Sequence, residues 1–156
     1  VQSHIPARIP ISERPRIVER RRHAGHWAAD PAVSRASVAA LQVAAERKTR
    51  LTRLSKLERK GAHEMHITLT RRLNRCPAHL RKTITYDNGS ENTDHEQTND
   101  VLGTRSYFCA PYHSWEKGTV AVFESARVYL SREGDLPEER EMVVCAGLGH
   151  ALATVR

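Results

Sequence analysis

Apolar and polar positions alternate along the middle of the chain in a pattern that predicts three successive strands. The three segments are HWAADPAV, ASVAALQVAAE and TRLTRLSKL, which occupy residues 26–33, 36–46 and 49–57. The third alternates polar and apolar residues with a period of two, which is typical of a strand with one buried face. The second is rich in alanine, so intrinsic propensity leaves a helix open as an alternative there.

The period changes after residue 57. Met65, Leu69 and Leu73 follow the spacing of an amphipathic helix over residues 60–76, which a proline then ends. Strands and helices then alternate: a strand at 81–87, a helix at 92–103 with Gly103 as its C-cap, a strand at 104–110, a loop at 111–119 and a helix at 120–130. Three antiparallel strands followed by alternating helices and strands predict an α/β fold, a mixed sheet flanked by helices, in the element order of the RNase H-like fold.

Composition and charge narrow the class of partner. The chain has 156 residues, enough for one domain with a sizeable core. Its 25 Lys and Arg against 18 Asp and Glu give a net charge of +7, and such a surface suits a polyanion such as nucleic acid. A basic protein without such a partner is the alternative explanation of the same charge.

Basic residues are densest near the start of the chain, at residues 8–22, where six arginines face only two glutamates. The segment ISERPRIVERRR predicts a short helix with Ser12 as its N-cap and Pro15 in its first turn. Its low apolar content predicts a basic arm or linker over residues 1–24, outside the core. Such an arm would either contact phosphates or form a solvated charged helix.

The cysteine spacing and the hydropathy of the chain indicate the cellular compartment in which the protein resides. Cys76, Cys109 and Cys145 are far apart and lack a CxxC spacing, which argues for a reducing compartment and against a disulfide framework or a structural zinc. No apolar run is long enough to span a bilayer and no signal-peptide pattern is evident. The sequence therefore predicts a cytoplasmic protein without membrane attachment.

The segment KTITYDNGSEN, residues 82–92, moves from apolar β-formers directly into Asp87, Asn88 and Gly89. One interpretation is turn chemistry, because Asn and Gly tolerate positive φ. The other is that Asp87 is a metal ligand at the end of a central strand, where ligands gather in such sheets. Asp30 lies on the first strand, which neighbours the strand of Asp87 in the RNase H-like arrangement. Two converging carboxylates would hold Mg²⁺ or Mn²⁺, and a pair of such ions suits in-line phosphoryl transfer.

Several long segments of the chain match one family of proteins. The segments are ERPRIVERR, HWAAD, AERKTRLTRLSKL, KTITYDNGSEN and HEQTNDVLGTRSYFCAPYHSWEKGTV, within about residues 8–120. They resemble bacterial insertion-sequence transposases that carry the integrase catalytic core, specifically the thirtieth-numbered insertion-sequence family. The resemblance implies an integrase-type catalytic core over residues 25–135, which uses a D-D-E triad and Mg²⁺ to cut and join DNA ends. Asp30 matches the first acid and Asp87 the second.

The resemblance also implies partners and a location: transposon ends and target DNA, a homo-oligomer, and the nucleoid in the bacterial cytoplasm. His113 and Lys117 would border the active site and touch DNA, with Lys117 pairing a phosphate; the alternative is a packed tryptophan between exposed polar residues. Arg47, Lys48 and Arg50 follow a strand and turn, where they would track a DNA backbone. The alternative is that these three charged residues lie on a solvent-exposed sheet edge and prevent aggregation there.

The third acid is where the chain departs from the family. The family has a glutamate in the motif GTVEN, whereas this chain reads GTVAVFE and has Ala121 at that position. Glu124, one helical turn further on, is the candidate substitute. Ala28 also stands where the family usually has an acid, and the tail over residues 136–156 diverges. The expected function is therefore that of a transposase catalytic domain for DNA integration, degenerate at its third acid. The alternative is an inactive remnant that only binds DNA or a partner.

Overall fold

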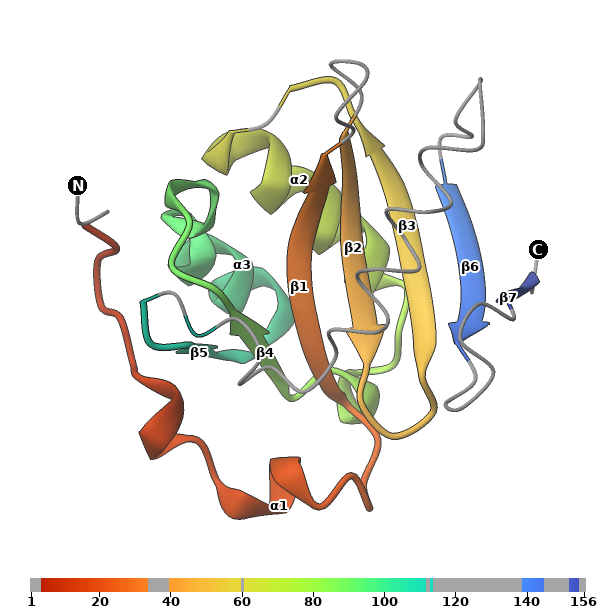
Figure 1. The fold of residues 1–156 in the computed structure, drawn as a ribbon, viewed down its shortest axis with the longest axis horizontal. Coiled ribbons are helices and arrows are strands. Elements are labelled where there is room, and N and C mark those ends of the chain that lie inside the picture. The colour runs from red at the N-terminus through yellow and green to blue at the C-terminus, as the bar shows by residue number, and fades with distance from the viewer. Residues whose placement is uncertain are drawn as a thin grey trace.

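One mixed sheet carries the fold in the computed structural model, which describes residues 4–33, 40–59, 61–111, 113, 139–144 and 152–154 (Figure 1). Its strands are β1 (His26–Val33), β2 (Ala40–Glu46), β3 (Leu51–Leu57), β4 (Thr83–Tyr86), β5 (Arg105–Phe108), β6 (Glu139–Val144) and β7 (Leu152–Thr154). They lie in the order β5-β4-β1-β2-β3-β6-β7. Neighbours among β1, β2 and β3 pair antiparallel, whereas β4 and β5 continue the sheet in parallel with β1.

Helices α2 (Ala62–Asn74) and α3 (His95–Leu102) cover one face of this sheet (Figure 1). Alternating strand positions and the apolar faces of the two helices form the core between them: Trp27, Ala29, Ile84, Tyr86, Leu69, Leu73 and Leu102. Because successive strand residues point to opposite faces, Ala28 and Asp30 lie on the other face of β1. None of the helices in the described ranges has the length and apolar character that a membrane span requires.

The predicted order of elements is confirmed between residues 26 and 110. The alanine-rich segment forms β2, and all 7 of its residues are buried, so the helical alternative is wrong. The first long helix begins and ends within two residues of its predicted bounds. Gly103 ends α3 in the left-handed conformation, with a φ of 71°. The helix predicted at 120–130 lies outside the described residues.

The helix predicted within residues 11–22 is replaced by two single turns. They are a 3-10 turn, η1 (Ile11–Glu13), and a four-residue helix, α1 (Arg16–Glu19), each preceded by a proline. Ser12 lies inside the first turn, so the prediction that it caps a helix is wrong. The break has a local cause: a residue before a proline disfavours the helical region, and Arg14 is extended, with a φ of −66° and a ψ of 131°.

The same N-terminal segment packs against the sheet. Val18 is 1% exposed and Arg14 is 6% exposed. Nη1 of Arg14 donates a hydrogen bond to Oγ1 of Thr85 on β4 at 3.0 Å, and Nε of Arg47 donates one to the main-chain oxygen of Val18 at 3.3 Å. The prediction that this segment lies outside the core is wrong, because a one-turn helix can bury a single apolar side chain that composition does not single out.

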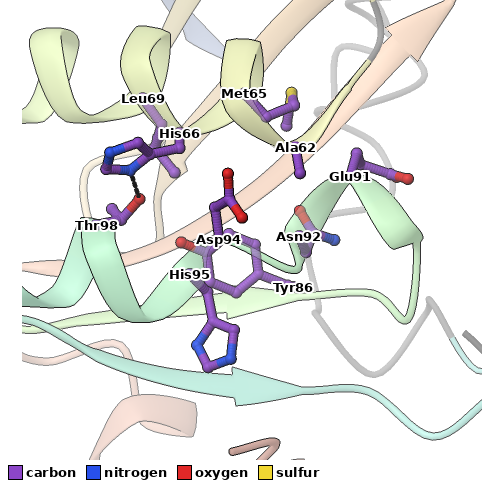
Figure 2. Close-up of a pocket in the computed structure, with 10 residues that line it drawn as sticks. All are labelled: Ala62, Met65, His66, Leu69, Tyr86, Glu91, Asn92, Asp94, His95 and Thr98. Carbon is purple, nitrogen blue, oxygen red and sulfur yellow. Dashed lines mark hydrogen bonds between the residues drawn. The ribbon is translucent and has the colours of Figure 1, made fainter. Parts of the chain in front are cut away.

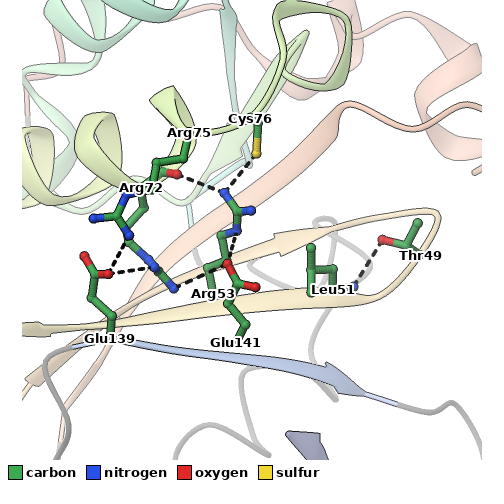
Figure 3. A network of polar contacts seen from close by, with 8 residues as sticks. All are labelled: Thr49, Leu51, Arg53, Arg72, Arg75, Cys76, Glu139 and Glu141. Atoms are coloured by element: carbon green, nitrogen blue, oxygen red, sulfur yellow. Dashed lines mark hydrogen bonds and ion pairs between the residues drawn. The ribbon is translucent and has the colours of Figure 1, made fainter. Parts of the chain in front are cut away.

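The stretch predicted as a divergent tail contributes β6, which pairs antiparallel with β3. Its two glutamates, Glu139 and Glu141, face arginines on β3 and α2 and the arginine that directly follows α2 (Figure 3). Ion pairs join Glu139 to Arg71, Arg72 and Arg75, and Glu141 to Arg53 and Arg72. Burial raises the pKa of Glu139, but the hydrogen bond from Arg75 and the nearby guanidinium charges outweigh it, so that the pKa lies below its usual value.

Replacing Val18 with alanine tests whether the N-terminal segment belongs to the folded unit. We expect Val18→Ala to lower the free energy of unfolding by about 2 kcal/mol, because it removes two buried carbon atoms. Ile17→Ala is the matched control: Ile17 is 45% exposed, and its replacement should change stability by no more than about 0.5 kcal/mol. Urea unfolding measures both values, and equal losses for the two variants would contradict the packing.

Replacing Glu139 tests the ion pairs that join β6 to the sheet and α2. We expect Glu139→Gln to lower the free energy of unfolding by about 1 kcal/mol at neutral pH, the scale of partly exposed ion pairs. Because the folded protein holds the pKa of Glu139 below its usual 4.5, this stabilisation is present above pH 4.5 and is lost as the pH falls below that value.

The difference between wild type and Glu139→Gln should therefore shrink in acid and at high salt. Urea unfolding at several pH values measures it, and Glu96→Gln, at an exposed position of α3, serves as the control. A loss of stability that is the same at pH 7 and at pH 3 would show that charge is not its cause.

Candidate metal centre

The parallel pairing of β1 with β4 brings the two predicted acids level with one another. Ala28 pairs with Thr85 in this register. Asp30 follows Ala28 by two residues and Asp87 follows Thr85 by two, so both acids lie on the face opposite α2 and α3. Neighbouring strands are about 4.8 Å apart. The strands themselves therefore place the two carboxylates side by side.

A third carboxylate joins these two from the loop after β4. The loop turns back through a 3-10 turn, η3 (Ser90–Asn92), and carries Glu91 toward the strand ends. Carboxylate oxygens of Asp30, Asp87 and Glu91 all lie within 4.8 Å of one another. Asp30 and Asp87 are half-buried, whereas Glu91 is only 9% exposed.

Two groups of the same loop orient the carboxylate of Asp87. The main-chain N–H of Gly89 and the side-chain amide of Asn92 each donate a hydrogen bond to its Oδ1, both at 3.1 Å. The Asn92 amide also donates to the main-chain oxygen of Asp87 at 3.2 Å. Asn92 is 3% exposed, so these bonds are shielded from water. Asp87 is thus held in one orientation by its own loop.

Asn88 ties this loop to two distant segments. Its side-chain amide donates to the main-chain oxygen of Cys109, just after β5, and its Oδ1 accepts a hydrogen bond from Nε of Arg8 at 2.7 Å. Nη2 of Arg8 donates to the same Cys109 oxygen at 2.8 Å. Neither Asn88 nor Gly89 has a positive φ. The interpretation of this segment as a turn that needs positive φ is therefore wrong.

The three acids form a chemically suitable site for a hard divalent cation. Carboxylate oxygens are the ligands that Mg²⁺ and Mn²⁺ prefer, and such ions complete their coordination with water. Three negative charges within 4.8 Å of one another also repel, and a cation between them would offset that repulsion. Sequence reasoning assigned Glu91 no role; its spacing of four residues after Asp87, in the same segment, was the available signal.

Three of the basic residues predicted to contact DNA lie at the other end of the strands. Arg47, Lys48 and Arg50 belong to the turn between β2 and β3, next to the start of β1. Arg47 is 3% exposed and bonds the Val18 oxygen, and burial together with the charge of Arg14 lowers its pKa to about 10. Lys48 is exposed and Arg50 is half-buried, so these two remain the candidates for DNA contact.

Other predicted site residues lie near or beyond the limit of the described chain. His113 is exposed, and its main-chain N–H donates to the oxygen of Ala110 at 2.9 Å. Lys117 and Glu124, as well as Ala121, lie outside the described residues. Their predicted roles stay predictions.

The arrangement of strands is that of an integrase catalytic core. The catalytic core domain of BIV integrase superimposes with a TM-score of 0.55 at 19% identity, covering 70% of this chain and 70% of that one. A simian T-cell lymphotropic virus intasome in complex with PP2A regulatory subunit B56 gamma superimposes with a TM-score of 0.55 at 16% identity, covering 88% and 48%. The predicted RNase H-like α/β fold is confirmed.

In sequence, the chain is similar to insertion-sequence transposases. The chain is 34% identical over 110 residues to transposase InsI for element IS30A of Escherichia coli, which covers 70% of this chain and 28% of that protein. It is 33% identical over 136 residues to the IS1086 transposase of Cupriavidus metallidurans, covering 86% and 40%, and 36% identical over 114 residues to the IS4351 transposase of Bacteroides fragilis, covering 73% and 35%. The predicted resemblance is confirmed.

The chain spans between 28% and 40% of the length of these relatives. No protein-family model matches it.

Proposed function

We propose that the chain is the catalytic core of an insertion-sequence transposase, which cuts DNA at transposon ends and joins them to target DNA. The observation that carries this proposal is the register of β1 and β4, which sets Asp30 and Asp87 level on one face. The similarity to insertion-sequence transposases supports DNA as the substrate. A homo-oligomer at the bacterial nucleoid, in the cytoplasm, is part of the same proposal.

The reaction would proceed in two steps of the same kind. Water attacks a phosphorus atom at the transposon end and the bond to the 3′ oxygen breaks, which leaves a 3′ hydroxyl and a 5′ phosphate. That hydroxyl then attacks a phosphorus atom of target DNA and displaces its 3′ oxygen. Mg²⁺ or Mn²⁺, when bound, would activate the attacking oxygen and stabilise the leaving one.

The residues of the chain would supply position and charge for these steps. Asp30 and Asp87 would hold the cation, and the bonds from Gly89 and Asn92 would keep the Asp87 carboxylate in position to bind it. Such bonds matter because a ligand that turns away costs metal affinity. The remnant that binds DNA without cutting it is the second candidate, and the replacement of the expected acid by Ala121 favours it.

A strand-transfer assay on a donor-end duplex, with Mg²⁺ or Mn²⁺, tests the proposed activity. We expect metal-dependent cleavage that falls by about 100-fold or more in Asp87→Asn, because a carboxylate that holds the cation is lost. Asp100→Asn, at an exposed position of α3, is the matched control and should cleave like wild type. Cleavage that survives Asp87→Asn would overturn the assignment of Asp87 as a metal ligand. A wild-type protein that binds DNA but does not cleave it would support the inactive remnant.

DNA binding is tested separately by its dependence on salt. If Lys48 contacts a phosphate, Lys48→Ala should weaken binding of every duplex alike and reduce the slope of log affinity against log salt by about 1. Lys56→Ala, at an exposed position of β3, is the control. Fluorescence anisotropy measures both slopes. A slope unchanged by Lys48→Ala would remove the β2–β3 turn from the DNA interface.

A further inference from the structure

We propose that Glu91 is the third carboxylate ligand of the cation site, in place of the acid that is missing at Ala121. The proposal rests on the proposed function, because it takes the cation to lie between Asp30 and Asp87. It concerns a residue to which the resemblance assigns no role. Three observations about Glu91 support it: its proximity to both acids, its isolation from other polar partners and the space that Gly89 leaves for its carboxylate.

The first two observations belong together. Glu91 is 9% exposed, and its carboxylate neither accepts a hydrogen bond nor forms an ion pair among the described residues. The carboxylates of Asp30 and Asp87 lie within 4.8 Å of it and repel it. A carboxylate on a mostly buried side chain beside two other acids is costly, and a cation held by all three acids would offset that cost.

The direction of the side chain agrees with this role. Glu91 lines one end of a small pocket between α2 and α3, and His66 and Thr98 line the other end, where a hydrogen bond joins Nδ1 of His66 and Oγ1 of Thr98 at 2.7 Å (Figure 2). Its carboxylate points away from His66 and Thr98 (Figure 2). Glu91 therefore does not serve the contact between the two helices.

Gly89 provides the space that the Glu91 carboxylate occupies. A Cβ atom at position 89 would lie 2.1 Å from Oε1 and 2.3 Å from Oε2 of Glu91. Gly89 has a φ of −66° and a ψ of 145°, which any residue adopts, so the backbone conformation does not require glycine there. The carboxylate thus lies directly against the backbone whose N–H orients Asp87.

Direct measurement of Mn²⁺ binding to the full chain, without DNA, tests the proposal. Isothermal titration calorimetry would give the affinity, and unfolding temperature with and without Mn²⁺ would give an independent measure, since a bound ion stabilises the folded state. We expect Glu91→Gln to lower the Mn²⁺ affinity by about tenfold or more and to reduce the thermal stabilisation by Mn²⁺ accordingly.

Gly89→Ala should weaken binding in the same way although it removes no ligand. Its Cβ displaces only the end of a flexible side chain, so we expect the unfolding temperature without metal to stay near that of wild type. Glu91→Gln should likewise keep the fold without metal, because it relieves repulsion among the three carboxylates. Glu96→Gln, at an exposed position, is the control and should bind Mn²⁺ like wild type. Glu124→Gln tests the competing candidate for the third ligand and should keep its Mn²⁺ affinity if Glu91 binds the cation.

The outcomes separate this proposal from the proposed function. Loss of affinity in Asp87→Asn together with full affinity in Glu91→Gln would overturn the role of Glu91 and leave the cation site of Asp30 and Asp87 intact. Loss of affinity in Glu124→Gln with none in Glu91→Gln would overturn it in favour of Glu124. Full affinity in Asp87→Asn would overturn the cation site itself, and the proposed function with it.

Discussion

The parallel register between β1 and β4 is the constraint on which the candidate site depends. Pairing of Ala28 with Thr85 sets Asp30 and Asp87 level. A slip of one residue would turn one of the acids toward the helices, and a slip of two would separate them by about 7 Å along the strands. What prevents a slip is the opposite face of the same strands, where Trp27 and Ile84 pack under α2 and α3. Apolar packing on one face thus sets the spacing of charges on the other.

The loop after β4 connects this packing to the rest of the molecule. Its Asn88 meets Arg8 from the N-terminal segment and the end of β5, and its Asn92 holds Asp87. Carboxylates that repel one another remain close only if the surrounding structure holds them there. Three segments that are distant in sequence share that task, which explains why the N-terminal residues pack on the sheet.

The positive charge of the chain is divided between the surface and the fold. Arg14 and Arg47 join the N-terminal segment to the sheet, while Arg53 and Arg72 pair with glutamates of β6. These arginines are counted in the net charge of +7, yet their guanidinium groups are engaged within the molecule. A basic composition therefore indicates a polyanionic partner without identifying which cations meet it. Exposed residues such as Lys48 are the better candidates.

The sequence by itself determined the order of β1 to β5 with α2 and α3, and the pairing of Asp30 with Asp87. Periods of two and of 3.6 residues are local properties, and the order of elements then limits the sheet to few arrangements. Tertiary structure alone decided that Val18 is buried, that Arg47 is covered and that Glu91 turns toward the two aspartates. Each depends on which distant segment packs against one side chain. The pattern of residues along the chain does not predict such contacts, because they form only when the sheet, the loop and the N-terminal turns pack together.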